Sequence, residues 1–170
     1  MKKQSKTNYV FPILIITGII GFAILVLQGK NTPTSNTSAS PLVTDVLIAD
    51  EKSYDFGTIS MQDGKVSKIF KVKNESQSEI LLSKLYTSCM CTEATLIREN
   101  GRRYGPYGMP GHGPTILGQK LNPGEIFGIE VTFDPAAHGP AGIGQIVREV
   151  YLEGTKARLL TLRIEANVTP

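Results

Sequence analysis

Two cysteines, Cys89 and Cys91, have the residue type and spacing most suited to chemistry. They stand in Ser-Cys-Met-Cys-Thr and are the only cysteines among 170 residues. On an extended strand, residues i and i+2 point to one face with Cα atoms about 6.5–7 Å apart, near or beyond the reach of an unstrained disulfide. Two thiolates on one face can instead bind a soft metal ion without bonding to each other.

The chain also has only two histidines, and they stand in similar surroundings. His112 lies in Gly-His-Gly-Pro and His138 in Ala-His-Gly-Pro, each within a stretch rich in glycine and proline. In one interpretation each imidazole hydrogen-bonds within a tight turn. In the other, imidazole and thioether ligands complete a metal shell begun by the thiolates, with Met90 as an alternative thioether. The second interpretation predicts a Cu or Zn site made of Cys89, Cys91, Met109, His112 and His138.

The cysteine pair has three interpretations, which the sequence leaves open. In the first, the thiols have a structural role, either packed at the end of a strand or joined in a disulfide. In the second they bind a metal, and in the third they form a strained and readily reduced redox pair. The chain has no GxSxG, HExxH, P-loop or GxGxxG pattern, and its carboxylates are scattered. We therefore predict no catalytic residue, and the sequence does not indicate an enzyme.

The N-terminal part has the pattern of a membrane anchor. Residues 10–27 carry no charge and would form a helix about 27 Å long, enough to span a bilayer. Lys2, Lys3 and Lys6 precede this run, which predicts a cytoplasmic N-terminus at 1–9. Residues 28–44 are rich in Ser, Thr and Asn, so we expect a flexible stalk. A cleaved signal peptide is the alternative; the anchor predicts a single-pass protein of the cytoplasmic membrane with its domain outside.

The charge distribution excludes one class of partner. Beyond Lys30 the chain has fourteen basic and fifteen acidic side chains, so this part has a net charge of −1. It has no basic stripe and no RNA-reading motif, which argues against nucleic-acid binding.

Residues 45–170 have the length of one domain and the period-two pattern of β-strands. Apolar side chains alternate with polar ones along 127–133 and 160–168. The other candidate strands are 46–49, 54–59, 66–73, 79–86 and 145–152. Turn signals separate these segments, which predicts an antiparallel β-sandwich of about seven strands. The glycines and prolines near 98–117 predict a long irregular loop.

Five short motifs, in order, resemble the bacterial domain-of-unknown-function family 1573. They are YDFGTIS (54–60), FKVKNES (70–76), SCMCT (88–92), LNPGE (121–125) and VTFDP (131–135). The resemblance implies an immunoglobulin-type sandwich, related to Hydin-type and major-sperm-protein domains, in an exported or membrane-anchored protein. It implies no established activity. Two departures are Met90, where the family usually has glycine, and the longer stretch 93–119.

Two function classes follow. The first is an extracytoplasmic binding or scaffolding module that receives a protein partner at a sheet edge or at the loop face. It requires nothing beyond the fold, so we favour it from the sequence. The second is a metal-binding or thiol-redox protein that uses the cysteine pair and the histidine loops.

Overall fold

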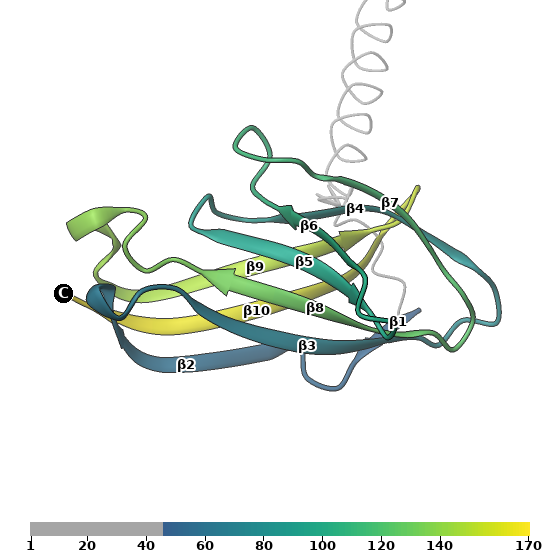
Figure 1. The fold of residues 1–170 in the computed structure, drawn as a ribbon, viewed down its shortest axis with the longest axis horizontal. Coiled ribbons are helices and arrows are strands. Elements are labelled where there is room, and N and C mark those ends of the chain that lie inside the picture. The colour runs from purple at the N-terminus through teal and green to yellow at the C-terminus, as the bar shows by residue number, and fades with distance from the viewer. Residues whose placement is uncertain (1–45) are drawn as a thin grey trace, which may run out of the picture. The chain divides into compact units, whose positions relative to one another are not determined.

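The computed structural model describes residues 46–170, which form two five-stranded β-sheets packed face to face (Figure 1). The predicted anchor, stalk and cytoplasmic N-terminus lie outside these residues. Within 46–170 no helix has the length and apolar character needed to cross a membrane.

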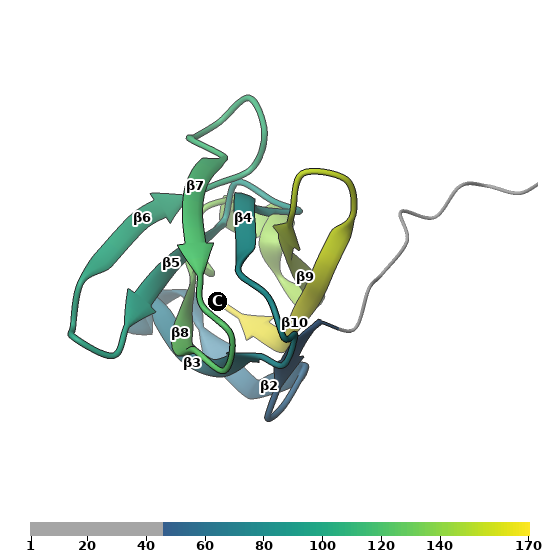
Figure 2. The ribbon, with the colours of Figure 1, turned by 90° about the vertical axis from the view of Figure 1, so that its right-hand side faces the viewer.

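The strands divide between the two sheets as follows. The first sheet has the spatial order β1 (Leu47–Ala49), β3 (Val66–Asn74), β8 (Ile126–Phe133), β5 (Thr92–Arg98) and β6 (Arg103–Tyr107). The second has the order β2 (Ser53–Ser60), β10 (Arg158–Thr169), β9 (Gly144–Glu153), β4 (Ile80–Thr87) and β7 (Ile116–Leu121). Two short 3-10 segments, η1 (Met61–Asp63) and η2 (Gly139–Gly142), are the only helical elements in the described part of the chain. Seen end-on, β6 and β7 approach each other from the two sheets (Figure 2).

The core lies between the sheets and consists of the apolar side chains that alternate along each strand. The alternation predicted for two strands is confirmed, because every apolar member is buried: Phe127, Ile129, Val131 and Phe133 in β8, and Leu160, Leu162, Ile164, Ala166 and Val168 in β10. A slip of one residue in either strand would turn all these side chains towards water. Burial of the core therefore fixes the register of the central strands.

The predicted β-sandwich is confirmed, and its strand count is corrected from about seven to ten. Each of the seven predicted segments is a strand, whereas β5, β6 and β7 were not predicted. One pair is also not antiparallel, because β2 runs parallel to β10. After β2 the chain passes through η1 into β3 of the other sheet. β2 and β10 are therefore not joined by a hairpin, which would make them antiparallel.

The stretch 98–117 differs from the single irregular loop that its composition predicts. β5 ends at Arg98, β6 occupies part of the stretch and β7 begins at Ile116, which leaves 99–102 and 108–115 as loops. β6 tolerates Pro106 because it is an edge strand paired only with β5, where a missing N–H costs little. Between the pairs Ala94–Tyr107 and Leu96–Tyr104, β6 has one residue more than β5, and a register shift accommodates it.

The buried polar side chain of Asn74 holds two turns together at the end of the sandwich where β3 ends. The Asn74 amide donates to the carbonyl groups of Leu121 (3.1 Å) and Asn122 (2.9 Å), and its oxygen accepts from the Ser76 N–H (3.0 Å). Asn74 has no exposed surface. These bonds connect the β3–β4 turn to the β7–β8 turn.

We predict that Asn74→Ala lowers the free energy of unfolding by about 2–3 kcal/mol, because buried carbonyl groups lose their donor. Urea denaturation of the purified protein measures the change. Gln77→Ala, at an exposed position in the same turn, is the matched control and should stay within about 0.5 kcal/mol of wild type. Equal stability of the two variants would show that the Asn74 bonds contribute nothing.

Candidate metal centre

Cys89 and Cys91 lie in the connection that crosses from one sheet to the other. β4 ends at Thr87 and β5 begins at Thr92, so residues 88–91 make the crossing in four positions. The Thr92 N–H donates to the carbonyl of Cys89 (3.1 Å), and the buried Thr87 hydroxyl donates to the same carbonyl (2.9 Å). The two cysteines therefore share a hydrogen-bonded turn, not the extended strand from which their spacing was first interpreted.

Backbone hydrogen bonds fix this turn to two neighbouring elements. The Ser88 N–H donates to the Glu149 carbonyl in β9 (2.9 Å), and the Glu149 N–H donates to the Ser88 hydroxyl oxygen (2.9 Å). On the other side, the Asp134 N–H donates to the Cys91 carbonyl (2.9 Å), immediately after β8 ends. The turn is thus held against the start of the β8–β9 loop.

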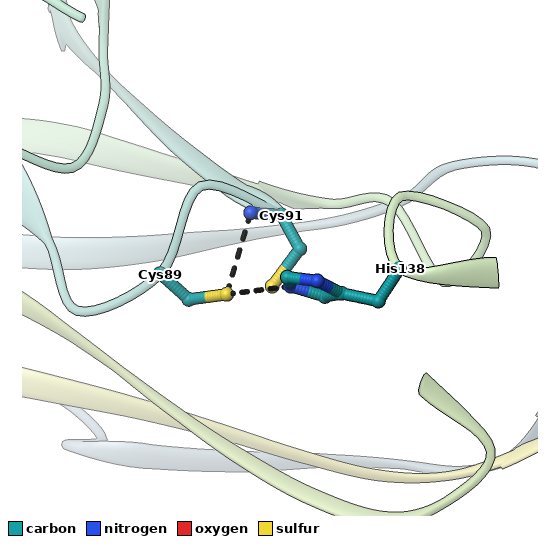
Figure 3. Close-up of side chains that lie close together, drawn as sticks. All are labelled: Cys89, Cys91 and His138. Carbon is teal, nitrogen blue, oxygen red and sulfur yellow. Dashed lines mark hydrogen bonds between the residues drawn. The ribbon is translucent and has the colours of Figure 1, made fainter. Parts of the chain in front are cut away.

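That loop carries His138 to the cysteines. The Asp134 side chain accepts from the Ala136 N–H (2.9 Å), and the Gly139 N–H donates to the Ala136 carbonyl (2.9 Å). Gly139 has φ of +54°, a conformation that glycine adopts without strain. The chain therefore folds back at His138, whose imidazole points at the cysteine turn (Figure 3).

The three side chains bring their ligand atoms together. Cys89 Sγ lies 3.1 Å from His138 Nε2, and all three ligand atoms, including Cys91 Sγ, lie within 4.8 Å of one another. Neither sulfur is in a disulfide. Cys91 is buried at 2% exposure, Cys89 is half-buried and His138 is exposed, so the group opens to solvent on the imidazole side. Among residues 46–170 this is the only cluster of three such ligands.

Arg148 of β9 supplies a positive charge beside the thiols. Its Nε donates to Cys91 Sγ (3.1 Å), and its Nη1 donates to the Val147 carbonyl (2.8 Å). Arg148 has the same strand parity as the buried Ile146 and Val150, so it occupies an inward position. Sequence reasoning missed this residue. A charged side chain at an inward position of an alternating strand was the signal that could have identified it.

These contacts give the two thiols different acidities. Partial burial raises the pKa of Cys89, but hydrogen bonds from Cys91 and His138, together with the charge of Arg148, outweigh it and lower that pKa to about 7. For Cys91, burial and the hydrogen bond to Cys89 raise the pKa despite the opposing effect of Arg148. Near neutral pH the first proton therefore leaves Cys89.

Of the five predicted ligands, the structure clusters Cys89, Cys91 and His138. His112 is not part of this group of ligands, although its loop, 108–115, starts beside the cysteine turn, where the Thr87 N–H donates to the Gly108 carbonyl (3.3 Å). Met109 lies in the same loop, and its carbonyl accepts from the His112 N–H (2.9 Å). Sequence context alone could not distinguish the two histidines.

The donor set fits a soft metal ion. Around one ion with metal–ligand bonds of about 2.0–2.3 Å, the ligand atoms lie about 3.5–4 Å from each other. The three ligand atoms lie within 4.8 Å of one another, so small side-chain rotations would bring them to the separation that an ion requires. An open groove of about 300 Å³, lined by His138 and Arg148, adjoins the group and gives an ion access.

Comparisons with solved structures found proteins that this chain resembles. The chain is similar to a protein of unknown function from Porphyromonas gingivalis W83, at 13% identity and a TM-score of 0.50, over 78% of this chain and 51% of that one. It is also similar to a PapD-like domain of human CEP192, at 14% identity and a TM-score of 0.42, over 82% of this chain and 98% of that one.

The first likeness shows the β-sandwich fold alone, and the chain spans about half the length of that protein. No curated protein matches the sequence. The sequence profile of the family described as protein of unknown function (DUF1573) matches residues 47–102. This match confirms the resemblance carried by the motifs, and the matched residues include the cysteine turn.

Proposed function

We propose that this chain is a soft-metal-binding protein in which Cys89, Cys91 and His138 together hold one Cu(I) or Zn(II) ion. The observation that carries the proposal is the convergence of three ligand atoms within 4.8 Å, from a turn and a loop far apart in sequence. Thiolate and imidazole are the ligands that these ions prefer over the oxygen ligands of Mg²⁺ or Ca²⁺. The ion would connect the β4–β5 turn to the β8–β9 loop.

A purely structural role for the cysteines accounts for less of the site. Packing explains the buried Cys91, which behaves as a small apolar residue. It does not explain why a half-buried thiol faces an imidazole at 3.1 Å while an arginine donates to the neighbouring sulfur. Polar groups gathered around two thiols favour a role that uses the thiolates.

The proposal extends to location. We place the metal centre outside the cytoplasmic membrane, on an immunoglobulin-like domain carried by the stalk (28–44) and the anchor (10–27). Exposed thiol pairs tend to oxidise in that compartment, and a bound soft ion would protect them. The strand register supports access of an ion from solvent to this centre. Thr92 and Val66 both pair with Phe133, the last residue of β8, so the cysteine turn lies at one end of the sandwich, opposite to Asn74.

One observation favours the binding or scaffolding role as a second candidate. The outer face of the first sheet has a shallow hollow of about 400 Å³, lined mainly by apolar atoms. Ile69, exposed at 54%, and Gly128 are among the residues that line it. A protein partner on this face would not compete with the metal centre, since the hollow lies at the end of β5 and the start of β8, whereas the cysteine turn precedes β5 and the histidine loop follows β8.

We predict that the reduced full-length protein binds one equivalent of Cu(I) or Zn(II) and that Cys89→Ser abolishes binding. His138→Ala should weaken binding by more than the roughly 10–100-fold that loss of an outer-shell partner costs. Competition with a coloured chelator under anaerobic conditions measures both effects. His112→Ala is the matched control, because His112 is outside the cluster, and its affinity should equal that of wild type. Absence of binding, or equal losses in the two histidine variants, would contradict the proposed ligand set.

We also predict a pH-dependent difference between the two thiols of the metal-free protein. The thiolate is the reactive form, so alkylation of Cys89 by iodoacetamide should rise with pH and reach half its maximum rate near pH 7. Cys91, whose pKa is raised, should react only at higher pH.

Fragment-ion mass spectrometry assigns the alkylated sulfur. His138→Ala removes one hydrogen bond that lowers the Cys89 pKa, so the midpoint should move to higher pH. Two thiols that titrate together near their ordinary pKa would show that His138 and Arg148 do not act on them.

A further inference from the structure

We propose that Arg148 makes the metal centre select a monovalent soft ion, Cu(I), over divalent Zn(II). This inference rests on the proposed function, because it concerns the same three ligands. The structure supplies two independent observations for it: a fixed positive charge beside the thiols, and a cluster of two cysteines and one histidine that no carboxylate or second histidine joins among the described residues.

Charge balance is the first argument. Two thiolates and a neutral imidazole carry a charge of −2, so a bound Cu(I) leaves the complex at −1 and a bound Zn(II) leaves it neutral. A guanidinium stays protonated at any physiological pH. Its Nε lies 3.1 Å from Cys91 Sγ, close enough to stabilise the residual negative charge of a Cu(I) complex. A neutral Zn(II) complex offers the guanidinium no such compensation.

The surroundings of Arg148 leave its charge available to the thiols. Within residues 46–170 it forms no salt bridge with a carboxylate, and its other bond goes to the Val147 carbonyl. The adjacent Glu149 carboxylate accepts instead from the Tyr151 hydroxyl (2.6 Å). Asp134, which contacts the cysteine turn, has its side chain engaged with the Ala136 N–H. The thiols of Cys91 and Cys89 are therefore the acidic groups that interact with Arg148.

The number of ligands is the second argument. Zn(II) in structural sites almost always takes four ligands in a tetrahedron, whereas Cu(I) accepts two or three soft ligands. In the described part of the chain no Asp, Glu or second His joins the cluster. Zn(II) would need water or another donor to complete its shell. A three-ligand set beside a cation thus favours the ion of lower charge and lower coordination number.

The test is the ratio of Cu(I) affinity to Zn(II) affinity, measured by chelator competition on the full-length, reduced protein. Taking the ratio cancels any effect of Arg148 on the metal-free thiols. Arg148→Gln should lower the ratio at least tenfold, whereas Arg148→Lys, which keeps the charge, should stay within threefold of wild type. Arg163→Gln, which removes an exposed arginine paired with Glu165 on β10, is the matched control and should not change the ratio.

The outcomes separate this inference from the proposed function. If wild type binds neither ion, the proposed metal centre fails. If both ions bind at Cys89, Cys91 and His138 but Arg148→Gln changes the ratio by less than threefold, the metal centre stands and charge selection by Arg148 is wrong. Circular dichroism confirms folding, and Arg148→Met serves as the neutral variant if the glutamine variant does not fold.

Discussion

The register between β5 and β8 is the constraint on which the candidate metal centre depends. Ala94 and Leu96 of β5 pair with Val131 and Ile129 of β8, and all four are buried. Because a slip of one residue would expose them, the core determines that β5 starts where β8 ends. The cysteine turn before β5 and the histidine loop after β8 therefore emerge together, and the bond from the Asp134 N–H to the Cys91 carbonyl fixes them. Metal-binding geometry here is a consequence of apolar packing.

Arg148 shows how the same packing accommodates a charge. An arginine at an inward position of a strand would be costly in the middle of the core, where burial of an unpaired charge is strongly unfavourable. Here the residue pairs with Ile164 of β10, is only partly buried and donates to a sulfur and a carbonyl. Its position is tolerable because the Cys89 thiolate offsets its charge, and its charge in turn favours that thiolate form. The two features are mutually dependent.

Much of the fold could be predicted from the sequence, since long strands such as 160–168 show an unbroken apolar–polar alternation. β5, β6 and β7 could not, because Thr92 takes an apolar position in one and glycine or proline interrupts the others. The cysteines and His138 were identified by residue type. Which histidine lies beside the cysteines could not be predicted, because His112 and His138 have nearly identical local sequences. Only the pairing between distant strands distinguishes them. The turn containing the cysteines was likewise missed, since i and i+2 spacing is compatible with both a strand and a turn.

The most direct test of the metal centre is X-ray absorption spectroscopy of the full-length protein loaded with one equivalent of Zn(II). Ligation by Cys89, Cys91 and His138 predicts a first shell with two sulfur atoms at about 2.3 Å and one imidazole nitrogen at about 2.0–2.1 Å, completed by a water oxygen. The same spectrum should lose its sulfur contribution in the double variant Cys89→Ser, Cys91→Ser. A wild-type first shell made only of nitrogen and oxygen atoms would contradict a metal centre at the cysteine turn.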